Sequence, residues 1–464
     1  MKTALVYPRL RHQCFSFLPP LGLISLATVA KRAGFQVRLF DSSFDRGFSK
    51  LENELRRYEP DVVGFSVTSD LYPNARRLVA FAKSLGAVTL MGGPHPTIEP
   101  RQVLEECPAL DIVVRGEAEV TIVELLRALG SRSSLAGLEG IAYKSGSEII
   151  ENAPRGWIED LDTIPLPDRD LLPTYRRYSA SGYTGLVLTR GCPFDCRFCQ
   201  PALRTVAGRF RSRSPRRVAD EIEQLYHRYR NRVFHVDDDL LVLRREWLRE
   251  VSGELHERGL RGRLKFVVLS RVDVFDEELA EILRELGVWY VLFGVESGSQ
   301  EVLDSLKKKI TLDKTRAAFA RAKRYGFRTH AFVILGSPAE TRESLRETEE
   351  LIAELDPTSV FLSLFVPNPG THLRDELEQA HLVLPLDHRQ VNYYSWEGDR
   401  LGYRSEHISF GDVVRTRDRI LARRRLSFLL RNAWIAVETL VASRAPLQPL
   451  MLLDFYRKKK HFNG

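Results

Sequence analysis

Apolar strand-like runs alternate with amphipathic helical patterns along two stretches of this chain, and this alternation constrains the fold more than any other feature. Strands separated by helices form βαβ units, which build parallel sheets. The first stretch, residues 1–130, predicts a doubly wound parallel sheet of the Rossmann-like type. Its five strand candidates are 3–8, 35–41, Asp61–Thr68, Ala87–Met91 and Asp111–Val114.

The second stretch begins near Gly185 and repeats the pattern six times over the following residues. Six β/α repeats predict a partial, TIM-like barrel, in which functional groups gather at the carboxyl ends of the strands. The strand candidates are Leu186–Thr189, Val233–Val236, Lys265–Leu269, Tyr290–Phe293, His330–Leu335 and Val360–Phe365.

A chain of 464 residues is too long for one ordinary domain. We expect an α/β protein with a doubly wound domain over residues 1–135 and a barrel over residues 181–375. Residues 136–180 read as a connector that contains a small hairpin and a Pro-rich extended segment. Residues 376–464 lack a clear strand pattern and predict a helical, basic C-terminal cap.

The formal charge of +8 is concentrated at the C-terminal end. From Gly411 onward there are 12 Lys and Arg against 4 Asp and Glu, so the preceding residues are neutral overall. The basic run over 416–434 fits either the solvated face of a cap helix or a peripheral contact with an anionic membrane. Basic and aromatic residues do not interleave there, so no nucleic-acid partner is expected.

The N-terminus opens directly into a strand-like run, which is unlike a signal peptide. The late apolar stretch, Ala433–Phe455, is interrupted by charges and prolines and is a poor membrane span. We therefore expect a reducing, cytoplasmic location, with membrane association through the basic tail as the open alternative.

Three of the five cysteines, Cys192, Cys196 and Cys199, have the spacing C-x₃-C-x₂-C, whereas Cys14 and Cys107 are isolated. This is a poor disulfide framework and a good metal-ligand cluster. Structural zinc usually takes four protein ligands, and no fourth Cys or His lies nearby. Three thiolates on a four-iron cluster would leave one iron open to a ligand. Zinc and buried structural cysteines are the alternatives.

This triplet, with Phe198 before the third cysteine, resembles the signature of the radical S-adenosylmethionine (SAM) family. The resemblance continues through Phe210-Arg-Ser-Arg-Ser, His235-Val-Asp-Asp-Asp, Gly294-Val-Glu-Ser-Gly-Ser, Ile334-Leu-Gly-Ser-Pro-Ala-Glu-Thr and Pro367-Asn-Pro-Gly-Thr. It implies that a 4Fe-4S cluster on the three cysteines binds SAM and cleaves it reductively to a 5′-deoxyadenosyl radical.

The same resemblance assigns SAM contacts to positions of this sequence. Phe198 corresponds to an adenine contact, and Leu335 and Gly336 to the strand end that flanks adenine. Ser270, Arg271 and Glu296 correspond to positions near the carboxylate and ribose. Asp237, Asp238 and Asp239 stand where the family contacts the amino group, but the usual Gly-Gly-Glu motif is absent there.

Residues 1–130 resemble the cobalamin-binding domain that precedes many radical SAM modules. The matching segments are Leu18-Pro-Pro-Leu-Gly-Leu-Ile-Ser-Leu-Ala, Phe40-Asp41, Pro60-Asp-Val-Val-Gly-Phe-Ser, Gly92-Gly-Pro-His-Pro-Thr and Arg115-Gly-Glu-Ala-Glu. The resemblance implies a cobalamin site at the carboxyl edge of the sheet. The candidate contacts are Ser66, Gly92, Gly93, His95, Gly116 and Glu117.

The Asp-x-His-x-x-Gly motif that supplies a histidine to cobalt is missing, and the loop after the third strand reads Ser69-Asp70-Leu71-Tyr72. His95 is either a ligand or a loop histidine bonded to the backbone. His12 and Cys14 lie in the first strand's loop, near the same edge.

Together these features predict a cobalamin-dependent radical SAM methyltransferase. Its substrate would be a natural-product or lipid-like small molecule with an unactivated carbon, and its electron donor a protein such as flavodoxin or ferredoxin. The same cofactors could instead serve oxidative cyclisation or carbon-skeleton rearrangement. A non-catalytic corrinoid or cluster sensor is the third hypothesis.

Overall fold

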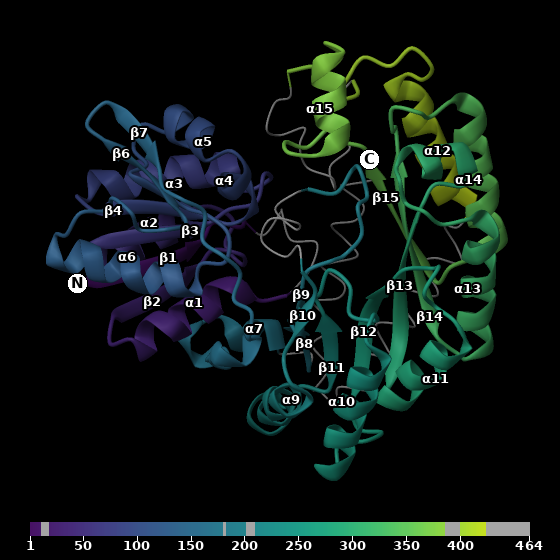
Figure 1. The fold of residues 1–464 in the computed structure, drawn as a ribbon, viewed down its shortest axis with the longest axis horizontal. Helices are drawn as coiled ribbons and strands as arrows, with labels where there is room; N and C mark the ends of the chain where they lie inside the picture. The colour runs from purple at the N-terminus through teal and green to yellow at the C-terminus, as the bar shows by residue number, and fades with distance from the viewer. Residues whose placement is uncertain (11–17, 180–181, 201–208, 386–399, 424–464) are drawn as a thin grey trace. The chain divides into compact units, whose positions relative to one another are not determined.

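The computed structural model describes residues 1–10, 18–179, 182–200, 209–385 and 400–423 (Figure 1). The chain divides into two compact units. The first contains Met1–Tyr178 and Gln200–Arg211, and the second contains Ser179–Cys199 and Ser212–Gly464. The two predicted strand–helix series therefore fall in different units.

In the described residues, the first unit carries a seven-stranded sheet in the order β2-β1-β3-β4-β5-β6-β7. The pairs among β1 to β5 are parallel, which confirms the predicted doubly wound sheet. The order 2-1-3-4-5 reverses between β1 and β3, the point where such sheets bind ligands. The elements are β1 (Lys2–Tyr7), α1 (Leu21–Arg32), β2 (Gln36–Asp41), α2 (Ser49–Tyr58), β3 (Val62–Ser66), α3 (Tyr72–Ser84), β4 (Val88–Gly92), α4 (Pro94–Ile98), α5 (Pro100–Glu106), β5 (Ile112–Val114), α6 (Glu119–Ser131), β6 (Ile141–Ser145), β7 (Glu148–Glu151) and α7 (Tyr175–Tyr178).

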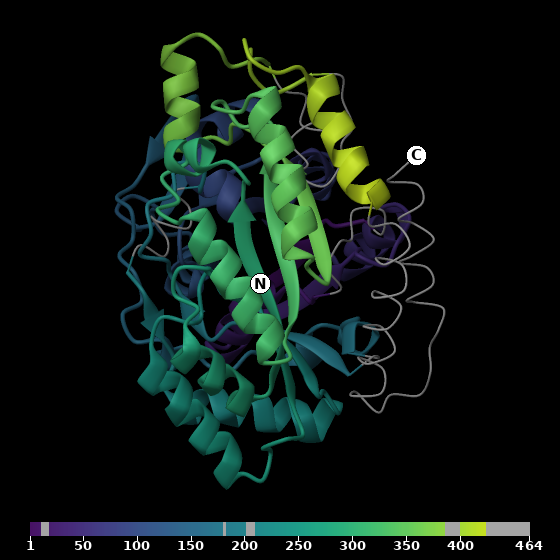
Figure 2. The same cartoon turned by 90° about the vertical axis from the view of Figure 1, so that its right-hand side faces the viewer.

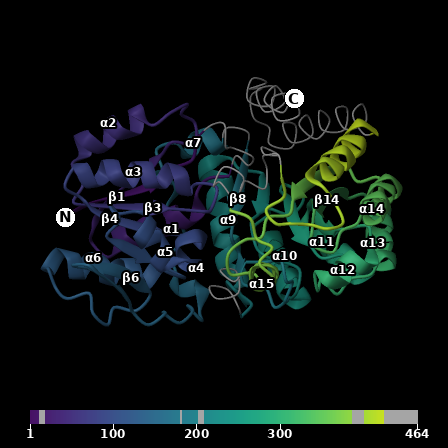
Figure 3. The same ribbon diagram turned by 90° about the horizontal axis from the view of Figure 1, so that it is seen from above.

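Helices cover both faces of this sheet, with α2 and α3 on one side and α1 and α6 on the other (Figure 3). The strands are apolar on both faces as a result. On β3, for example, Val63 and Phe65 enter the core under α2 and α3, whereas Val62 enters the core under α1 and α6. Continuous apolar runs, rather than alternating ones, are what doubly covered parallel strands require.

The predicted hairpin of the connector forms as β6 and β7, and it extends the sheet. β6 pairs antiparallel with β5, and Ile141 and Ala142 are fully buried in the two cores of the unit. An isolated two-stranded hairpin is only marginally stable in water, so pairing with the edge strand β5 stabilises this one. The Pro-rich segment that follows contains two short 3-10 turns, Leu161–Thr163 and Arg169–Leu171.

Over its described residues, the second unit carries a six-stranded sheet in the order β15-β14-β13-β12-β11-β8, with every neighbouring pair parallel. Helices lie in front of its strands in Figure 2, and the arrangement confirms the predicted partial barrel. The elements from Tyr183 onward are β8 (Tyr183–Leu186), β9 (Thr189–Arg190), β10 (Arg211–Ser212), α9 (Pro215–Tyr229), β11 (Val233–Val236), α10 (Arg245–Glu257), β12 (Lys265–Ser270), α11 (Glu277–Leu286), β13 (Val288–Glu296), α12 (Gln300–Ser305), α13 (Leu312–Arg324), β14 (Arg328–Leu335), α14 (Arg342–Leu355), β15 (Ser359–Leu364), α15 (His372–Gln379) and a helix over residues 410–423.

Strand β14 illustrates how the barrel sheet is faced. Thr329, Ala331, Val333 and Leu335 are buried, whereas His330, Phe332 and Ile334 between them are only half-buried. Alternation of this kind means that one face packs under helices and the other lines the interior of the curled sheet. Charged and glycine-rich segments follow the strands at their carboxyl ends.

The first barrel strand differs from its predicted range of Leu186–Thr189. It ends at Leu186, and the backbone N–H groups of Leu188 and Thr189 donate to the carboxylate of Asp238 at 2.8 and 2.9 Å. Because a side chain takes these donors, Leu188 and Thr189 do not continue the pairing of β8 with β11.

In the C-terminal region, Val383 and Tyr403 form an antiparallel bridge before the helix over residues 410–423. Four features of the sequence lie outside the described residues: His12, Cys14, residues 424–434 of the basic run and the stretch Ala433–Phe455. Among the described helices, none combines the length and apolar character needed to cross a membrane.

Candidate active site

The three cysteines lie on the loop after β9, where Gly191 takes a φ of +101°. Cys196 is buried, and Cys192 and Cys199 are half-buried. Burial, together with the neighbouring Cys196 and Cys192, raises the pKa of the Cys199 thiol to about 12. The three sulfurs therefore lie close enough to interact with one another.

This donor set fits an iron–sulfur cluster. Among the described residues, no three His, Cys, Asp or Glu side chains are gathered as ligands of a single ion. A 4Fe-4S cluster places each thiolate on a different iron and needs no such gathering. Burial raises the pKa of Cys192 as well, and Arg271 beside Cys192 and Lys308 beside Cys199 partly offset the effect of burial on these two thiols. Cations beside the thiols favour the thiolate form that metals bind.

The cysteine loop is held from both ends. On one side, Asp238 accepts the two backbone bonds described above and a third from the Thr189 hydroxyl at 2.8 Å. On the other, Arg197 donates to the Ser305 carbonyl oxygen at 2.7 Å and pairs with Glu376. These contacts fix the loop to strand ends and helices of the same unit.

The three predicted aspartates play different roles. Asp238 is fully buried with its pKa raised to about 7 by burial, and its carboxylate is engaged by the loop. Asp239 is half-buried and lies close enough to Cys192 and Cys199 to raise their pKa values. Asp237 is exposed. The contact to the SAM amino group stays a prediction for Asp237 and Asp239, whereas Asp238 is the loop's acceptor.

Arg271, directly after β12, is buried and points at the cysteine loop. Its Nε and Nη2 each donate to Asp273 at 2.9 Å, and Nη2 also donates to the Lys308 carbonyl oxygen at 2.7 Å. Nη1 lies 3.8 Å from Cys196 Sγ. Its neighbour Ser270 is also buried, and the Ser270 hydroxyl donates to the Arg271 carbonyl oxygen at 3.2 Å.

Glu296, the last residue of β13, forms a buried ion pair with Lys308, with 2.5 Å between Oε1 and Nζ. Glu296 has a φ of +63°, and the register with β14 shifts between Gly294 and Glu296. A bulge of this kind re-aims a side chain at a strand end. The Lys308 ammonium also lies 5.7 Å from the Phe198 ring centroid.

Phe198, Arg271 and Glu296 thus lie near the cysteine loop, and their contacts to SAM stay predictions. The structure adds Lys308, which sequence reasoning missed. Lys308 sits between Lys307 and Lys309 in a run without a motif, and both neighbours have left-handed backbone. Those two turns direct the middle lysine inward, where it is 7% exposed.

Leu335 and Gly336, at the end of β14, are positioned by Glu340 and Tyr403. Glu340 accepts from the Gly336 and Ser337 N–H groups, and burial raises its pKa to about 8. The Tyr403 hydroxyl donates to the Gly336 and Ser337 carbonyl oxygens at 3.0 and 2.9 Å. Both backbone edges of this turn are therefore satisfied by side chains.

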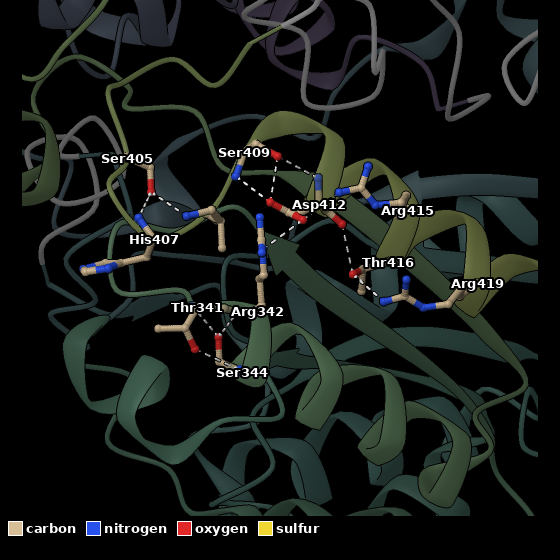
Figure 4. Close-up of polar contacts among 11 residues, drawn as sticks. Thr341, Arg342, Ser344, Ser405, His407, Ser409, Asp412, Arg415, Thr416 and Arg419 are labelled. Atoms are coloured by element: carbon tan, nitrogen blue, oxygen red, sulfur yellow. Dashed lines mark hydrogen bonds and ion pairs between the residues drawn. The ribbon is translucent and has the colours of Figure 1, made fainter.

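The helix over residues 410–423 packs on the same turn. Asp412 caps it through Ser409 and pairs with Arg342, the first residue of α14, at 3.2 Å (Figure 4). Asp412 also accepts from Arg415 at 2.7 Å. A Cβ at Gly336 would lie 3.6 Å from Val413, so this turn and the helix are in direct contact.

In the first unit, Gly92 and Gly93 allow two strand-end loops to approach closely. Gly93 has a φ of +107°, and a Cβ there would lie 2.6 Å from the Val67 carbonyl oxygen. Val67 N donates to the Gly92 carbonyl oxygen at 2.8 Å, and half-buried Ser66 precedes it on β3. Gly92 and Gly93 therefore allow the end of β4 to pack directly against Val67, and a corrinoid contact at this edge stays a prediction.

His95 and Gly116 lie at neighbouring strand ends. The His95 ring is 7% exposed, its Nδ1 is 3.2 Å from Ser69 Oγ, and it packs on Tyr72. These contacts are with side chains of the neighbouring loop and helix, and a role of His95 at the corrinoid stays a prediction. Gly116 takes a φ of +72° with open space where a Cβ would be, and its N–H donates to Thr97.

Glu117 is buried and accepts from Arg211 at 3.0 and 2.8 Å and from Ile158 N at 2.9 Å. Its carboxylate is therefore an internal support of the first unit, and a direct cobalamin contact stays a prediction.

Comparison with known proteins agrees with both halves of this picture. Residues 186–352 match the Radical SAM superfamily, and residues 13–126 match the B12 binding domain. An uncharacterized methyltransferase of Pyrococcus horikoshii is 33% identical over 418 residues, which cover 89% of this chain and 88% of that protein. This chain belongs to the cobalamin-binding radical SAM family.

Other members of this family are similar at greater distance. The anaerobic magnesium-protoporphyrin IX monomethyl ester cyclase of Cereibacter sphaeroides is 31% identical, over 81% of this chain and 62% of that protein. The structure of the radical SAM methyltransferase TsrM from Kitasatospora setae, with tryptophan and a SAM analogue bound, superposes with a TM-score of 0.70. It is 21% identical and covers 83% of this chain and 77% of that one, so it supports the fold.

Membership of the cobalamin-binding radical SAM family makes this chain an enzyme whose cofactors are a 4Fe-4S cluster, SAM and cobalamin. The cysteine loop offers the ligands of the cluster. The corrinoid contacts at the strand ends of the first unit stay a prediction.

Proposed function

We propose that this radical SAM enzyme methylates an unactivated carbon of a natural-product or lipid-like small molecule. The observation that carries the proposal is the relative from Pyrococcus horikoshii, a methyltransferase by name, which matches 88% of its own length. When bound, the cluster and SAM supply a hydrogen-abstracting 5′-deoxyadenosyl radical, and cobalamin supplies the methyl group.

Residues at the carboxyl edge of the barrel would bind the different parts of SAM. Glu296 and Lys308 offer one anion and one cation to a zwitterionic methionine group and ribose hydroxyls, which need such partners. Phe198 offers an aromatic face to adenine. The Gly336–Ser337 turn, held by Glu340 and Tyr403, offers a fixed backbone edge beside it.

The inner face of the barrel sheet supports a largely apolar, uncharged substrate. Phe332, Ile334 and Phe361 share this face by register and remain half-buried. Lower on the same face, Tyr183 and His235 hydrogen-bond each other at 2.8 Å, and burial lowers the pKa of His235. Neutral hydroxyl and imidazole groups suit a substrate with a hydroxyl or carbonyl oxygen.

We further propose that a flavodoxin- or ferredoxin-type protein delivers the electron. Membrane contact through the basic C-terminal run would suit a lipid-like substrate, and liposome flotation with anionic and neutral vesicles tests it.

Oxidative cyclisation is the second candidate, because the cyclase relative is 31% identical. It is the weaker candidate, because the match covers only 62% of that protein. The mass of the product separates the two reactions, since methyl transfer adds one CH₂ unit and cyclisation or rearrangement does not.

The test begins with anaerobic purification with cobalamin, followed by measurement of iron, sulfide and corrin per chain. Reduced enzyme with SAM and candidate lipids should give 5′-deoxyadenosine and a methylated product. Cys192→Ala should lose the cluster and both products. Absence of 5′-deoxyadenosine from enzyme with a full cluster would contradict the radical chemistry.

A further inference from the structure

We infer that Arg271 sets the reduction potential of the cluster through an N–H···S hydrogen bond to Cys196, rather than binding the carboxylate of SAM. The inference rests on cluster binding by the three cysteines and is independent of what the enzyme methylates.

The geometry assigns the guanidinium to the cluster loop. Nη1 lies 3.8 Å from Cys196 Sγ, within hydrogen-bonding range for sulfur. Nε and Nη2 are already engaged by Asp273 and by the Lys308 carbonyl oxygen. The side chain is 7% exposed, and Nη1 is the guanidinium nitrogen that faces the cysteine loop.

Two further contacts keep the guanidinium in this orientation. Its central carbon lies 3.7 Å from the ring centroid of Phe194, which is on the cysteine loop itself. The bond to the Lys308 carbonyl oxygen ties it to the segment that carries the Glu296–Lys308 pair. Arg271 therefore links β12 to the cysteine loop through an aromatic face and a thiol at once.

A cation bonded to a coordinated thiolate stabilises the reduced cluster, because reduction adds negative charge. Hydrogen bonds to sulfur and nearby charge are established determinants of iron–sulfur potentials. Asp273 opposes this effect, since its carboxylate offsets the arginine charge across two hydrogen bonds. The pair should therefore act on the potential with opposite signs.

This opposition defines the experiment, a spectroscopically monitored redox titration of the reconstituted enzyme without SAM. Arg271→Gln should shift the cluster potential to a more negative value, and Asp273→Asn should shift it to a more positive value. Arg271→Lys keeps the charge and should fall between wild type and Arg271→Gln. The matched control is Arg245→Gln on α10, which removes an arginine paired with Asp276 and Glu278. It should leave the potential unchanged.

SAM affinity, measured by anaerobic equilibrium dialysis with the oxidised enzyme, separates this role from a carboxylate contact. A tuning arginine leaves the Kd of Arg271→Gln within about twofold of wild type, whereas a lost charged hydrogen bond to SAM weakens it about tenfold or more.

The inference is overturned if Asp273→Asn, with wild-type iron and sulfide content, leaves the potential unchanged or lowers it. It is also overturned if SAM affinity falls while the potential stays fixed. If Arg271→Gln cannot hold a cluster, Asp273→Asn and Arg271→Lys still decide the question. Failure of methylation with shifted potentials would contradict the proposed function and leave this inference standing.

Discussion

The carboxyl edges of the two sheets are built from different chemistry. At the edge of the first sheet, Gly92, Gly93 and Gly116 lie at the strand ends, and buried His95 packs on Tyr72. At the edge of the second sheet, buried ionisable side chains follow the strands: Asp238, Arg271, Glu296, Lys308 and Glu340.

The difference corresponds to the two kinds of cofactor. A corrinoid is wide and is accommodated by shape, so its edge needs backbone without obstructing side chains. A small zwitterion and an anionic cluster are recognised by charge, so their edge needs ionic groups in fixed positions. Removing a buried charge at the second edge should therefore destabilise the second unit. Adding a methyl group to a glycine at the first edge should destabilise the first unit.

The largest effect on stability is expected at Lys308. Lys308→Met leaves Glu296 buried without its cation, and breaking a buried pair by removing one partner costs about 3–5 kcal/mol. Denaturant unfolding of the enzyme measures this loss. Lys314→Met, at an exposed position of α13, should leave the unfolding free energy unchanged within about 0.5 kcal/mol. Equal losses of unfolding free energy in the two variants would contradict the stabilising role of the buried Glu296–Lys308 pair.

Gly93→Ala tests the shape of the first edge. The new methyl group would meet the Val67 backbone at 2.6 Å at a φ that alanine rarely adopts, so we expect a loss of about 3 kcal/mol and weaker retention of cobalamin. Gly34→Ala is the matched control, because Gly34 has a φ of +91° but nothing within 4 Å. It should cost only about 1 kcal/mol, the conformational penalty alone.

Glu340 should make stability depend on pH. Its pKa in the folded protein, about 8, lies above that of an unfolded glutamate. Its stabilising contribution is therefore complete below the unfolded value and is lost as the pH rises toward 8. Glu340→Gln should remove up to about 1.4 kcal/mol per pH unit from the slope of unfolding free energy between pH 5 and 8.

Asp412→Asn is the control for this slope. Hydrogen bonds from Ser409 hold the pKa of Asp412 well below its usual value, so its contribution to stability is lost only in acid. The variant should keep the wild-type slope between about pH 5 and 8. An unchanged slope in Glu340→Gln would contradict the assignment of a buried, titrating carboxyl.

The smallest effect is expected for Tyr403→Phe, which removes one hydroxyl shared by two backbone carbonyl oxygens. Loss of a buried hydrogen bond costs about 1 kcal/mol. If the turn positions SAM, the KM for SAM should rise while kcat stays near wild type. Tyr143→Phe, in the first unit, is the comparison and should leave both kinetic constants unchanged.

The sequence was sufficient for both sheets, because apolar strand runs and the segments between them are local signals. It was insufficient where a side chain accepts the backbone hydrogen bonds that would otherwise extend a strand, as Asp238 does at Leu188 and Thr189. It also could not choose among Lys307, Lys308 and Lys309, because only the backbone turns decide which one faces inward. Similarly, Arg271 was predicted from a motif, but its direction toward Cys196 depends on Phe194 and Asp273.

The first unit is built from two separate segments of the chain. It includes Gln200–Arg211, which follows the cysteines in the chain, and Arg211 is the cation that neutralises buried Glu117. A gene fragment that ends at Tyr178 would encode the sheet but omit the arginine that pairs with this carboxylate. Exchange of this module between related genes, by recombination or by design, therefore has to transfer two separate coding segments together.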